Sequence, residues 1–482
     1  MTARARRDPR WLSRPIRLGT SGWRGTLGDE VTDERVRAFV LGAAAWLARR
    51  GAGARVLVGF DGRFASERLA DLAARTLQAR GLDAVVASGV TPTPALARAV
   101  PRRRAAGGLM LTASHNPAHD HGIKLFGPRG EAIGPRAAAQ VEAAAARALA
   151  RAPRDVSSPG RRVRSDLAGS YIRDLARACG EVLRTSPRLR VVYDAMHGAG
   201  AGVFDAALLS AGTRIELLRA APDPFFGGVA PDPVPEQLSA LARRVRAGRG
   251  LRLGLATDGD ADRIASVDET GRVLSDGEQA ALILDHLART GRVRRGVALT
   301  FAVGSLLDRV AACHGLRATR HPIGFKHLSV ELQAGRAEVA IDESGGVAFA
   351  PFALDKDGMF AGALLAESVA LRRIGLAAQL AALRKRHGAG AVGRRALPAT
   401  DALRAALERL RAAPPDRFGR SGVGRVDVRD GVRLELDDGF VMWRASGTEP
   451  LVRVYADAPG ARPLQARLVA AERWLRREAR LV

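Results

Sequence analysis

One pattern recurs three times along this chain and constrains its fold more than any other feature. Each copy has a strand, a helix, a second strand and a closing strand that runs into a polar loop. We expect strands at residues 56–58, 84–87 and 108–111, at 190–193, 215–218 and 251–256, and at 297–300 and 338–341. Short apolar runs bounded by glycine and polar turns are typical of buried strands. The repeat predicts three related α/β units, with chance similarity among generic α/β units as the alternative.

Each copy ends in a polar loop at the same place in its expected sheet. The loops read TASHNP at residues 112–117, TDGDADR at 257–263 and DESGG at 342–346. Open α/β sheets bind their ligands at the carboxyl ends of the strands. The three loops are therefore expected to line one cleft.

A different unit follows the third copy. We expect helices at residues 401–411 and 464–480, with antiparallel strands at 424–428, 432–436, 440–443 and 451–455. The predicted fold class is α/β, with three related α/β domains that have mixed sheets, followed by a smaller α+β C-terminal domain, around a central cleft. Stretches rich in proline, glycine and polar residues suggest the connections between domains. The expected domains are residues 1–155, 156–272, 273–392 and 393–482.

The formal net charge of +26 raises the question of a nucleic-acid partner. The arginines are spread over every expected helix rather than along one stripe. Aromatic residues make up only 5% of the chain, which leaves few side chains for base stacking. We therefore expect no nucleic-acid partner. The chain has no apolar run long enough for a transmembrane helix, so we expect no membrane partner either.

Lysine and cysteine are both rare in this chain. Of its 76 basic residues only four are lysine, and Lys124, Lys326 and Lys356 lie in or near the polar motifs. A lysine is a titratable point charge, unlike arginine, so such positions are candidates for chemistry. The two cysteines are too few for a disulfide framework, which favours a reducing, cytoplasmic location. The sequence leaves the oligomeric state unknown.

Three aspartates alternate with small residues in the second loop. Asp258, Asp260 and Asp262 would repel one another unless a cation lay between them. Carboxylate oxygens are the ligands that Mg²⁺ prefers, so we expect a magnesium site here. Arg263 is placed to offset the charge or to contact a phosphoryl oxygen. A solvated acidic turn is the alternative.

The C-terminal unit contains a candidate phosphate cradle. An arginine fork, two hydroxyls and a glycine that lets backbone amides approach are suited to bind phosphate. These residues are Arg444, Ser446, Gly447 and Thr448, with Arg453 on the next strand. A Ser-Gly-Thr turn is also common without any ligand, so an ordinary turn stays open.

A candidate nucleophile lies in the first loop. Ser114 beside His115 is suited to nucleophilic chemistry, although a polar turn would explain the same residues. Lys124 follows ten residues later, and Arg24 lies between glycines in GTSGWRG. Either basic residue is also explained as a surface side chain.

Taken together, TASHNP, TDGDADR, DESGG and RASGTEP resemble, in this order, the four active-site loops of the α-D-phosphohexomutase superfamily. GTSGWRG, TPTPAL, GIKLF and GFK are similar to the same family. The loop PDPFFGGVAPDPVPE and the ending ESGG look more similar to phosphoglucomutases than to phosphoglucosamine mutases, and the resemblance as a whole is to the phosphoglucomutase/phosphomannomutase type. The likeness spans nearly the whole chain.

The resemblance implies a Mg²⁺-dependent enzyme that interconverts hexose 1-phosphate and hexose 6-phosphate. Its partners would be the phosphosugar substrate and a hexose 1,6-bisphosphate, with glucose preferred and mannose, or both sugars, as the alternative. Ser114 would carry the phosphoryl group and bind the metal with the three aspartates. The other catalytic candidates are His115, Lys124, Arg24 and Arg263, and the substrate-binding candidates are Gly324, Lys326, Asp342, Ser344, Lys356, Arg444, Ser446, Gly447, Thr448 and Arg453.

Two details stay open at this stage. For proton transfer Lys124 is favoured, with His115 and Lys356 as alternatives. The third loop departs from the family pattern, since Ile341 replaces a glycine and Asp342 stands at the first acidic position. Aspartate is one methylene shorter than glutamate, which leaves its reach to the sugar open.

Overall fold

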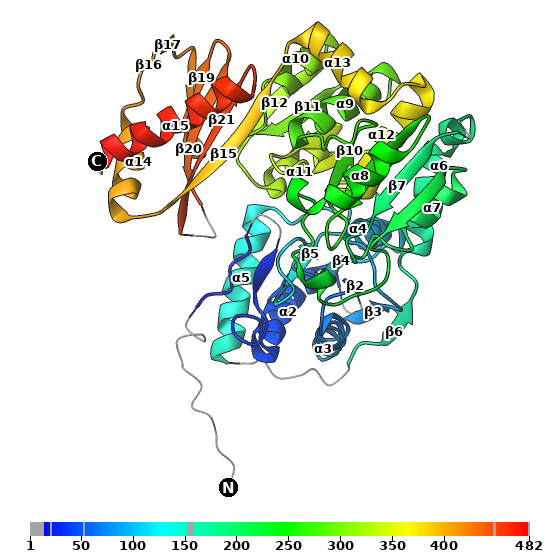
Figure 1. Cartoon of the computed structure of the whole chain (residues 1–482). Helices are drawn as coiled ribbons and strands as arrows, with labels where there is room; N and C mark the ends of the chain where they lie inside the picture. The colour runs from blue at the N-terminus through cyan, green and yellow to red at the C-terminus, as the bar shows by residue number, and fades with distance from the viewer. Residues whose placement is uncertain are drawn as a thin grey trace. The chain divides into compact units, whose positions relative to one another are not determined.

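The computed structural model of this chain is shown in Figure 1. It describes residues 14–19, 22–51, 54–151, 159–186, 188–446 and 450–480. By internal contacts the chain forms two compact units. The first comprises Met1–Val273 with Pro351–Arg373, and the second Leu274–Ala350 with Ile374–Val482. The four expected domain boundaries stay predictions.

The first unit begins with a six-stranded mixed sheet in the order β1-β5-β4-β2-β3-β6. Its strands are β1 (Trp23–Thr26), β2 (Arg55–Phe60), β3 (Asp83–Ala87), β4 (Gly107–Leu111), β5 (Asp120–Phe126) and β6 (Arg162–Ser165). All five residues of β4 are buried, as expected of a central strand covered on both faces. The helices are α2 (Asp33–Leu47), α3 (Ser66–Gln78), α4 (Thr93–Arg102) and α5 (Pro135–Ala150), with a short 3-10 turn η1 (Ala48–Arg50).

The same unit contains a second mixed sheet in the order β10-β9-β7-β8. Its strands are β7 (Arg190–Asp194), β8 (Arg214–Leu218), β9 (Arg252–Thr257) and β10 (Ile264–Val267). The helices are α6 (Gly169–Arg184), α7 (Phe204–Ser210), α8 (Ser239–Ala247) and α12 (Gly358–Arg372), with 3-10 turns η2 (Phe226–Gly228) and η3 (Pro235–Gln237). Helix α12 comes from the distant segment Pro351–Arg373 and packs on α6 and β10.

The second unit carries a third mixed sheet, ordered β12-β11-β13-β14. Its strands are β11 (Gly296–Thr300), β12 (Arg317–His321), β13 (Val339–Ile341) and β14 (Val347–Phe349). The helices are α9 (Asp276–Arg289), α10 (Leu306–Cys313), α11 (Phe325–Gln333) and α13 (Leu376–His387). A capping box at Ser275 and Glu278 starts α9, because each side chain accepts the other residue's backbone N–H.

The chain ends in an antiparallel sheet ordered β15-β21-β20-β19-β18. Its strands are β15 (Ala391–Pro398), β18 (Arg425–Asp427), β19 (Val432–Leu436), β20 (Gly439–Ala445) and β21 (Leu451–Ala458). A small hairpin, β16 (Arg417–Phe418) with β17 (Ser421–Gly422), and the helices α14 (Asp401–Ala412) and α15 (Ala461–Glu478) complete this part. The core centres on Trp443, whose indole N–H donates to the backbone oxygen of Ala471 in α15.

The predicted fold class is confirmed, and the repeat is more regular than the sequence indicated. In all three mixed sheets the strand order is the same once the strands are counted within each copy: closing hairpin strand, third, first, second. The sequence predicted the first, second and third strands of the first two copies and the first and third strands of the third copy. It missed the antiparallel hairpin strands β5, β10 and β14, and also β1, β6 and β12. Each polar loop therefore connects the third strand of its copy to that hairpin strand.

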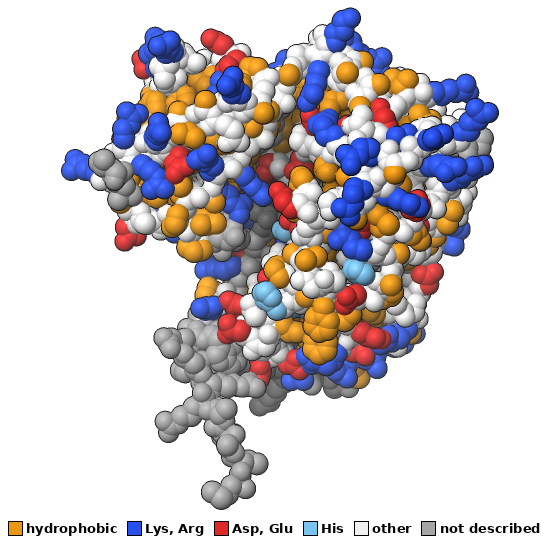
Figure 2. Space-filling view, in the orientation of Figure 1, with side chains coloured by type: hydrophobic (Ala, Val, Ile, Leu, Met, Phe, Trp, Pro, Cys, Tyr) orange, Lys and Arg blue, Asp and Glu red, His pale blue; other side chains and the backbone are white. Residues whose placement is uncertain are grey.

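The surface carries its positive charge widely. On the face shown in Figure 2, Lys and Arg side chains alternate with acidic and hydrophobic ones and do not gather in one patch. Among the described helices, none combines the length and the hydropathy that crossing a bilayer requires. On the side shown, the positive charge is thus spread over the surface.

One buried contact fastens the segment Pro351–Arg373 to the first unit. The hydroxyl of Tyr171 on α6 donates to Asp357 Oδ1 at 2.7 Å, and the same oxygen accepts the backbone N–H of Phe360 at 2.9 Å, capping α12. We expect Tyr171→Phe to lower the local opening free energy of α12 by about 1–3 kcal/mol, because a buried acceptor loses a partner.

Hydrogen exchange of the α12 amides measures this effect. Tyr193→Phe is the matched control, since that buried hydroxyl contacts Thr257 at 2.7 Å instead. Wild-type protection of α12 in Tyr171→Phe would show that the hydroxyl does not anchor the segment.

Candidate active site

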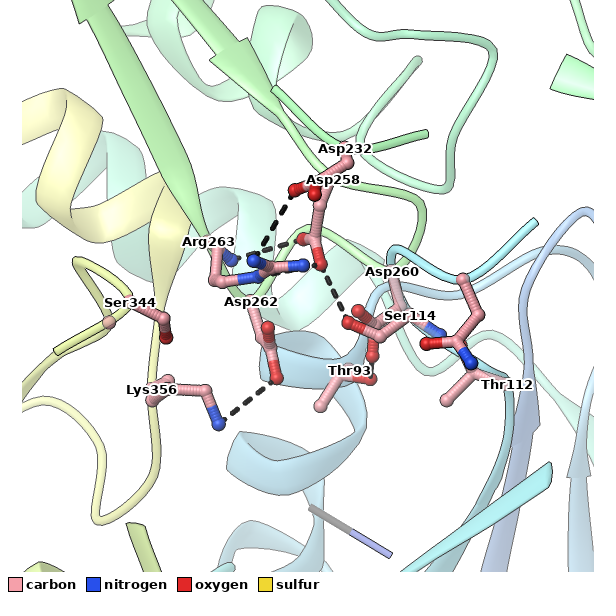
Figure 3. A network of polar contacts seen from close by, with 12 residues as sticks. Thr93, Thr112, Ser114, Asp232, Asp258, Asp260, Asp262, Arg263, Ser344 and Lys356 are labelled. Atoms are coloured by element: carbon pink, nitrogen blue, oxygen red, sulfur yellow. Dashed lines mark hydrogen bonds and ion pairs between the residues drawn. The ribbon is translucent and has the colours of Figure 1, made fainter. Parts of the chain in front are cut away.

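The TASHNP loop places Ser114 where strand β4 ends, as the sequence predicted. Ser114 is 1% exposed and its backbone φ of +55° lies in the left-handed region, which is costly for a residue other than glycine. Its Oγ donates a hydrogen bond to Asp258 Oδ2 at 2.7 Å, as Figure 3 shows. The loops of the first two repeats therefore meet at this pair.

The three aspartates of the second loop form one buried cluster. Asp258, Asp260 and Asp262 each offer an oxygen, and these oxygens lie within 4.8 Å of one another. Asp260 Oδ1 and Asp262 Oδ1 are buried and have no hydrogen-bond partner among the described residues. Burial, reinforced by Asp260 and Asp262, raises the pKa of Asp258 to about 7. Buried carboxylate oxygens with free acceptor positions fit a hard divalent cation.

Two lysines on the same unit balance the aspartates. Lys124 Nζ on β5 lies 2.5 Å from both Asp260 Oδ2 and Asp262 Oδ2. Lys356 Nζ lies 3.3 Å from Asp262 Oδ2. Burial alone would raise the pKa of Asp262, but Lys124 and Lys356 outweigh it and lower that pKa. Four of the sequence candidates, Lys124, Lys356, Asp260 and Asp262, thus meet here.

Arg263 and Arg24 add positive charge around Ser114. Arg263 Nε lies 3.3 Å from Asp258 Oδ2, and its Nη1 lies 3.4 Å from Asp232 Oδ1. Arg24 Nη1 donates to Asn116 Oδ1 in the serine loop at 2.9 Å. Burial lowers the pKa of Arg24.

His115 lies beside this cluster but is poorly placed to hold a proton. Burial first, and then the charges of Arg263 and Arg24, lower its pKa far below the usual histidine range. Its Nδ1 is buried and finds no hydrogen-bond partner in the described parts of the chain. The imidazole is therefore neutral at physiological pH.

Close backbone packing explains two glycines of the site. A Cβ on Gly259 would lie 2.5 Å from the backbone oxygen of Ser114, so a side chain there would separate the two loops. A Cβ on Gly358 would overlap the backbone of Arg263. That second contact explains why the Lys356 segment lies against the aspartate loop.

In the second unit, Asp342 accepts hydrogen bonds from other residues of its own loop, the third polar loop. Asp342 Oδ1 accepts hydrogen bonds from Ser344 N at 3.0 Å, Ser344 Oγ at 2.8 Å and Gly346 N at 2.9 Å. One carboxylate oxygen of Asp342 thus stabilises the turn of this loop. Glu343 accepts a bond from Thr300 Oγ1 at 2.9 Å, and burial, with the charge of Asp342, raises its pKa to about 7.

The same unit holds the basic candidates in place through one aspartate. Arg444 Nε donates to Asp430 Oδ1 at 2.7 Å, and Asp430 Oδ2 accepts the backbone N–H of Ile323 at 2.7 Å. Asp430 thus connects the arginine to the turn that starts α11 and carries Gly324 and Lys326.

The phosphate-cradle candidates lie on neighbouring strands. Arg444 on β20 pairs directly with Arg453 on β21, so both face the same side of the sheet. The backbone N–H of Ser446 donates to Leu451 O at 2.8 Å and closes the hairpin. Gly447 and Thr448 lie outside the described residues.

Sequence reasoning missed several residues that support the site. Asp430 and Asp232 belong to ordinary-looking turns and show their contacts only in the fold. Thr93 at the start of α4 donates its hydroxyl to Asp260 Oδ2 and its backbone N–H to Asp260 O. The sequence gives a weak indication for Thr93, since TPTPAL resembles a motif of the family.

Comparison with known proteins gives a consistent result across the chain. Family models of phosphoglucomutase/phosphomannomutase match in order, the alpha/beta/alpha domains I, II and III at residues 15–151, 169–271 and 276–387 and the C-terminal domain at residues 393–473. A probable phosphoglucosamine mutase of Methanothermobacter thermautotrophicus is 33% identical, covering 92% of this chain and 93% of its own length.

Two further proteins point the same way. A phosphoglucomutase/phosphomannomutase of Thermococcus kodakarensis is 31% identical over 92% of this chain and 94% of its own. The crystal structure of a putative phosphomannomutase from Thermus thermophilus superposes with a TM-score of 0.82 at 31% identity, covering 96% of this chain and 99% of that one. This chain is an enzyme of the phosphoglucomutase/phosphomannomutase family, within the α-D-phosphohexomutase superfamily.

Proposed function

We propose that this enzyme interconverts glucose 1-phosphate and glucose 6-phosphate through a phosphoserine at Ser114 and glucose 1,6-bisphosphate. The observation that carries the proposal is the hydrogen bond from Ser114 Oγ to Asp258 Oδ2, beside two buried carboxylates with free oxygens. The carboxylate at the oxygen of this serine, Asp258, belongs to the candidate metal cluster and is not a base set apart to activate a hydrolytic serine. That arrangement supports a phosphoryl carrier.

The reaction balances in two transfers. The bond between Ser114 Oγ and phosphorus breaks, a bond from phosphorus to O6 of glucose 1-phosphate forms, and the proton of the 6-hydroxyl passes through the acid–base residue to Ser114 Oγ. The bisphosphate then reverses its orientation in the site. The bond between O1 and phosphorus breaks, the phosphoryl group returns to Ser114 Oγ, and the serine proton passes to O1, so that glucose 6-phosphate is released and the phosphoserine is restored.

Charge balance is the main requirement of these transfers. A phosphoserine adds about −1.5 to −2 charge beside three aspartates. Lys124, Lys356, Arg24 and Arg263 contribute positive charge within the same unit. Ser114 Oγ, Asp258, Asp260 and Asp262 would hold Mg²⁺, which when bound supplies Lewis-acid stabilisation of the transferring group.

Lys124 is our candidate for proton transfer. Its ammonium nitrogen lies 2.5 Å from Asp260 and Asp262, so it can exchange a proton within the cluster. The strongly lowered pKa of His115 argues against that residue as a base that holds a proton at neutral pH. Lys356, which pairs with Asp262, remains the alternative.

The second unit is proposed to bind the rest of the substrate. Arg444 and Arg453, with Ser446, Gly447 and Thr448, would bind the phosphate that is not being transferred. Asp342 and Ser344, with Gly324 and Lys326, would contact the sugar.

We also propose a cytoplasmic location for this enzyme. Cys179 and Cys313 are free cysteines, in accord with that location.

The preferred sugar is the least constrained part of the proposal. Mannose phosphate, alone or together with glucose phosphate, is one alternative. Glucosamine phosphate is another, since several similar proteins are named phosphoglucosamine mutase or probable phosphoglucosamine mutase. Because Asp342 Oδ1 accepts three bonds within its own loop, only its second oxygen is left to select among hydroxyl and amino groups.

A three-sugar assay tests the function directly. We expect turnover of glucose 1-phosphate with Mg²⁺ and a trace of bisphosphate activator to exceed that of mannose 1-phosphate and glucosamine 1-phosphate. Ser114→Ala, assayed alongside, should be inactive with all three. Faster turnover of the amino sugar would replace glucose in the proposal, and full activity of Ser114→Ala would refute the phosphoserine mechanism.

Replacing one triad carboxylate tests the metal. Asp260→Asn should lower kcat and raise the Mg²⁺ concentration for half-maximal activity by at least about tenfold, because a charged ligand is lost. Asp268→Asn is the control, since that buried carboxylate serves the β10 turn through Thr270 and Arg272. An unchanged Mg²⁺ requirement in Asp260→Asn would remove the triad from the metal site.

A further inference from the structure

The backbone of Ser114 is held at both ends by a buried polar ring. Its N–H donates to Thr112 Oγ1 at 2.8 Å, and the Thr112 hydroxyl donates to Asp61 Oδ2 at 2.6 Å. Asp61 Oδ2 also accepts Arg63 Nε at 3.1 Å. Arg63 Nη2 then donates to the backbone oxygen of Ser114 at 2.5 Å, which closes the ring.

Arg63 holds far more than this one carbonyl. Its guanidinium also donates to the backbone oxygens of Asn116 at 2.7 Å, Pro117 at 2.7 Å and Asp120 at 3.1 Å. The side chains of Arg63 and Asp61 are both 0% exposed. A buried arginine that donates its hydrogen bonds to the backbone carbonyls of one loop fixes the shape of that loop.

Neighbouring side chains hold Asp61 and Arg63, the two charged members of this hydrogen-bonded ring, in position. Asp61 Oδ1 accepts the hydroxyl of Ser66 at 2.7 Å, and Ser66 Oγ lies 2.9 Å from His121 Nε2. The N–H of Gly122 donates to His121 Nδ1 at 2.8 Å, so the imidazole presents its own N–H to Ser66. On the other side, the ring of Phe226 lies 4.9 Å from the Arg63 guanidinium carbon.

The position that the ring holds is a strained one. Ser114 has a left-handed φ of +55°, a conformation that a serine adopts only when its surroundings impose it. In this conformation its Oγ reaches Asp258 in the second loop. We propose that Asp61, Arg63 and Thr112 are positioning residues that impose this conformation and so aim the phosphoryl carrier at the aspartate cluster.

This inference rests on the proposed phosphoserine function and adds residues to it. Arg63 and Thr112 act on the Ser114 backbone and make no contact with the triad carboxylates among the bonds described. Their loss should therefore impair the transfer step more than substrate binding. A displacement of about 1 Å at a reacting group can cost about 100-fold in rate.

The test uses two conservative variants with matched controls. Thr112→Val keeps the shape and removes the hydroxyl, and Arg63→Lys keeps the charge and removes the fork. Thr76→Val removes another buried hydroxyl, which donates to Leu72 O within α3. Arg68→Lys changes an exposed arginine paired with Asp33.

We expect kcat to fall about 10-fold to 100-fold in Thr112→Val and Arg63→Lys, with KM within about twofold, for the hexose 1-phosphate that the wild type turns over. The rate at which water removes the phosphate from Ser114, followed by intact mass, should change in the same variants. Both controls should match the wild type in every one of these measurements, and thermal unfolding reports any general loss of stability.

The results distinguish failure of the positioning role from failure of the proposed phosphoserine function. A phosphorylated, active wild type whose Thr112→Val variant differs no more than Thr76→Val would overturn the positioning role alone. An active wild type without phosphate on Ser114 would overturn the function and the inference together. If Arg63→Lys does not fold, Thr112→Val decides the question by itself.

Discussion

The hydrogen bond from Ser114 to Asp258 is the interaction on which the rest of the site depends. It connects the loop of the first repeat to the loop of the second, and it requires both backbones to approach closely. Gly259 permits that approach, because any side chain there would meet the Ser114 carbonyl. The left-handed conformation of Ser114 and the strain that goes with it follow from the same requirement.

Burying three carboxylates around this contact is costly unless cations accompany them. Lysines and arginines from several elements supply the positive charge. Lys124 comes from β5, Arg24 from β1 and Lys356 from the segment before α12. The segment Pro351–Arg373 belongs to the first unit, although the residues before and after it belong to the second. This course of the chain brings Lys356 to Asp262. Asp260 Oδ1 and Asp262 Oδ1 have no hydrogen-bond partner among the described residues, so these cations leave both oxygens available as metal ligands.

Much of the fold and of the site could be predicted because the relevant patterns are local. The three repeats, the loop positions, Ser114 and the aspartate triad all follow from short stretches of sequence. The hairpin strands β10 and β14 were missed because a short strand beside a polar loop lacks a distinct period, and β5 was missed although it has seven residues. The expected closing helix at 464–480 is found as Ala461–Glu478.

Residues that act across long sequence distances escaped prediction. Arg63 contacts the Ser114 carbonyl from 51 positions away, and in the sequence it is one arginine among many. Asp430 links Arg444 to Ile323 over more than a hundred residues. The bonding of Asp342 within its loop was also hidden, since only the folded turn shows where its oxygens point.

In the mechanism that we propose, Ser114 passes its phosphoryl group to the sugar and receives another in return. The most direct measurement starts from enzyme carrying ³²P on Ser114, mixed with unlabelled glucose 1-phosphate and Mg²⁺ in a single turnover. We expect the label to leave the protein and to appear in glucose 1,6-bisphosphate and glucose 6-phosphate. Label that stays on the protein while the sugar phosphates interconvert, or that appears only as inorganic phosphate, would contradict it.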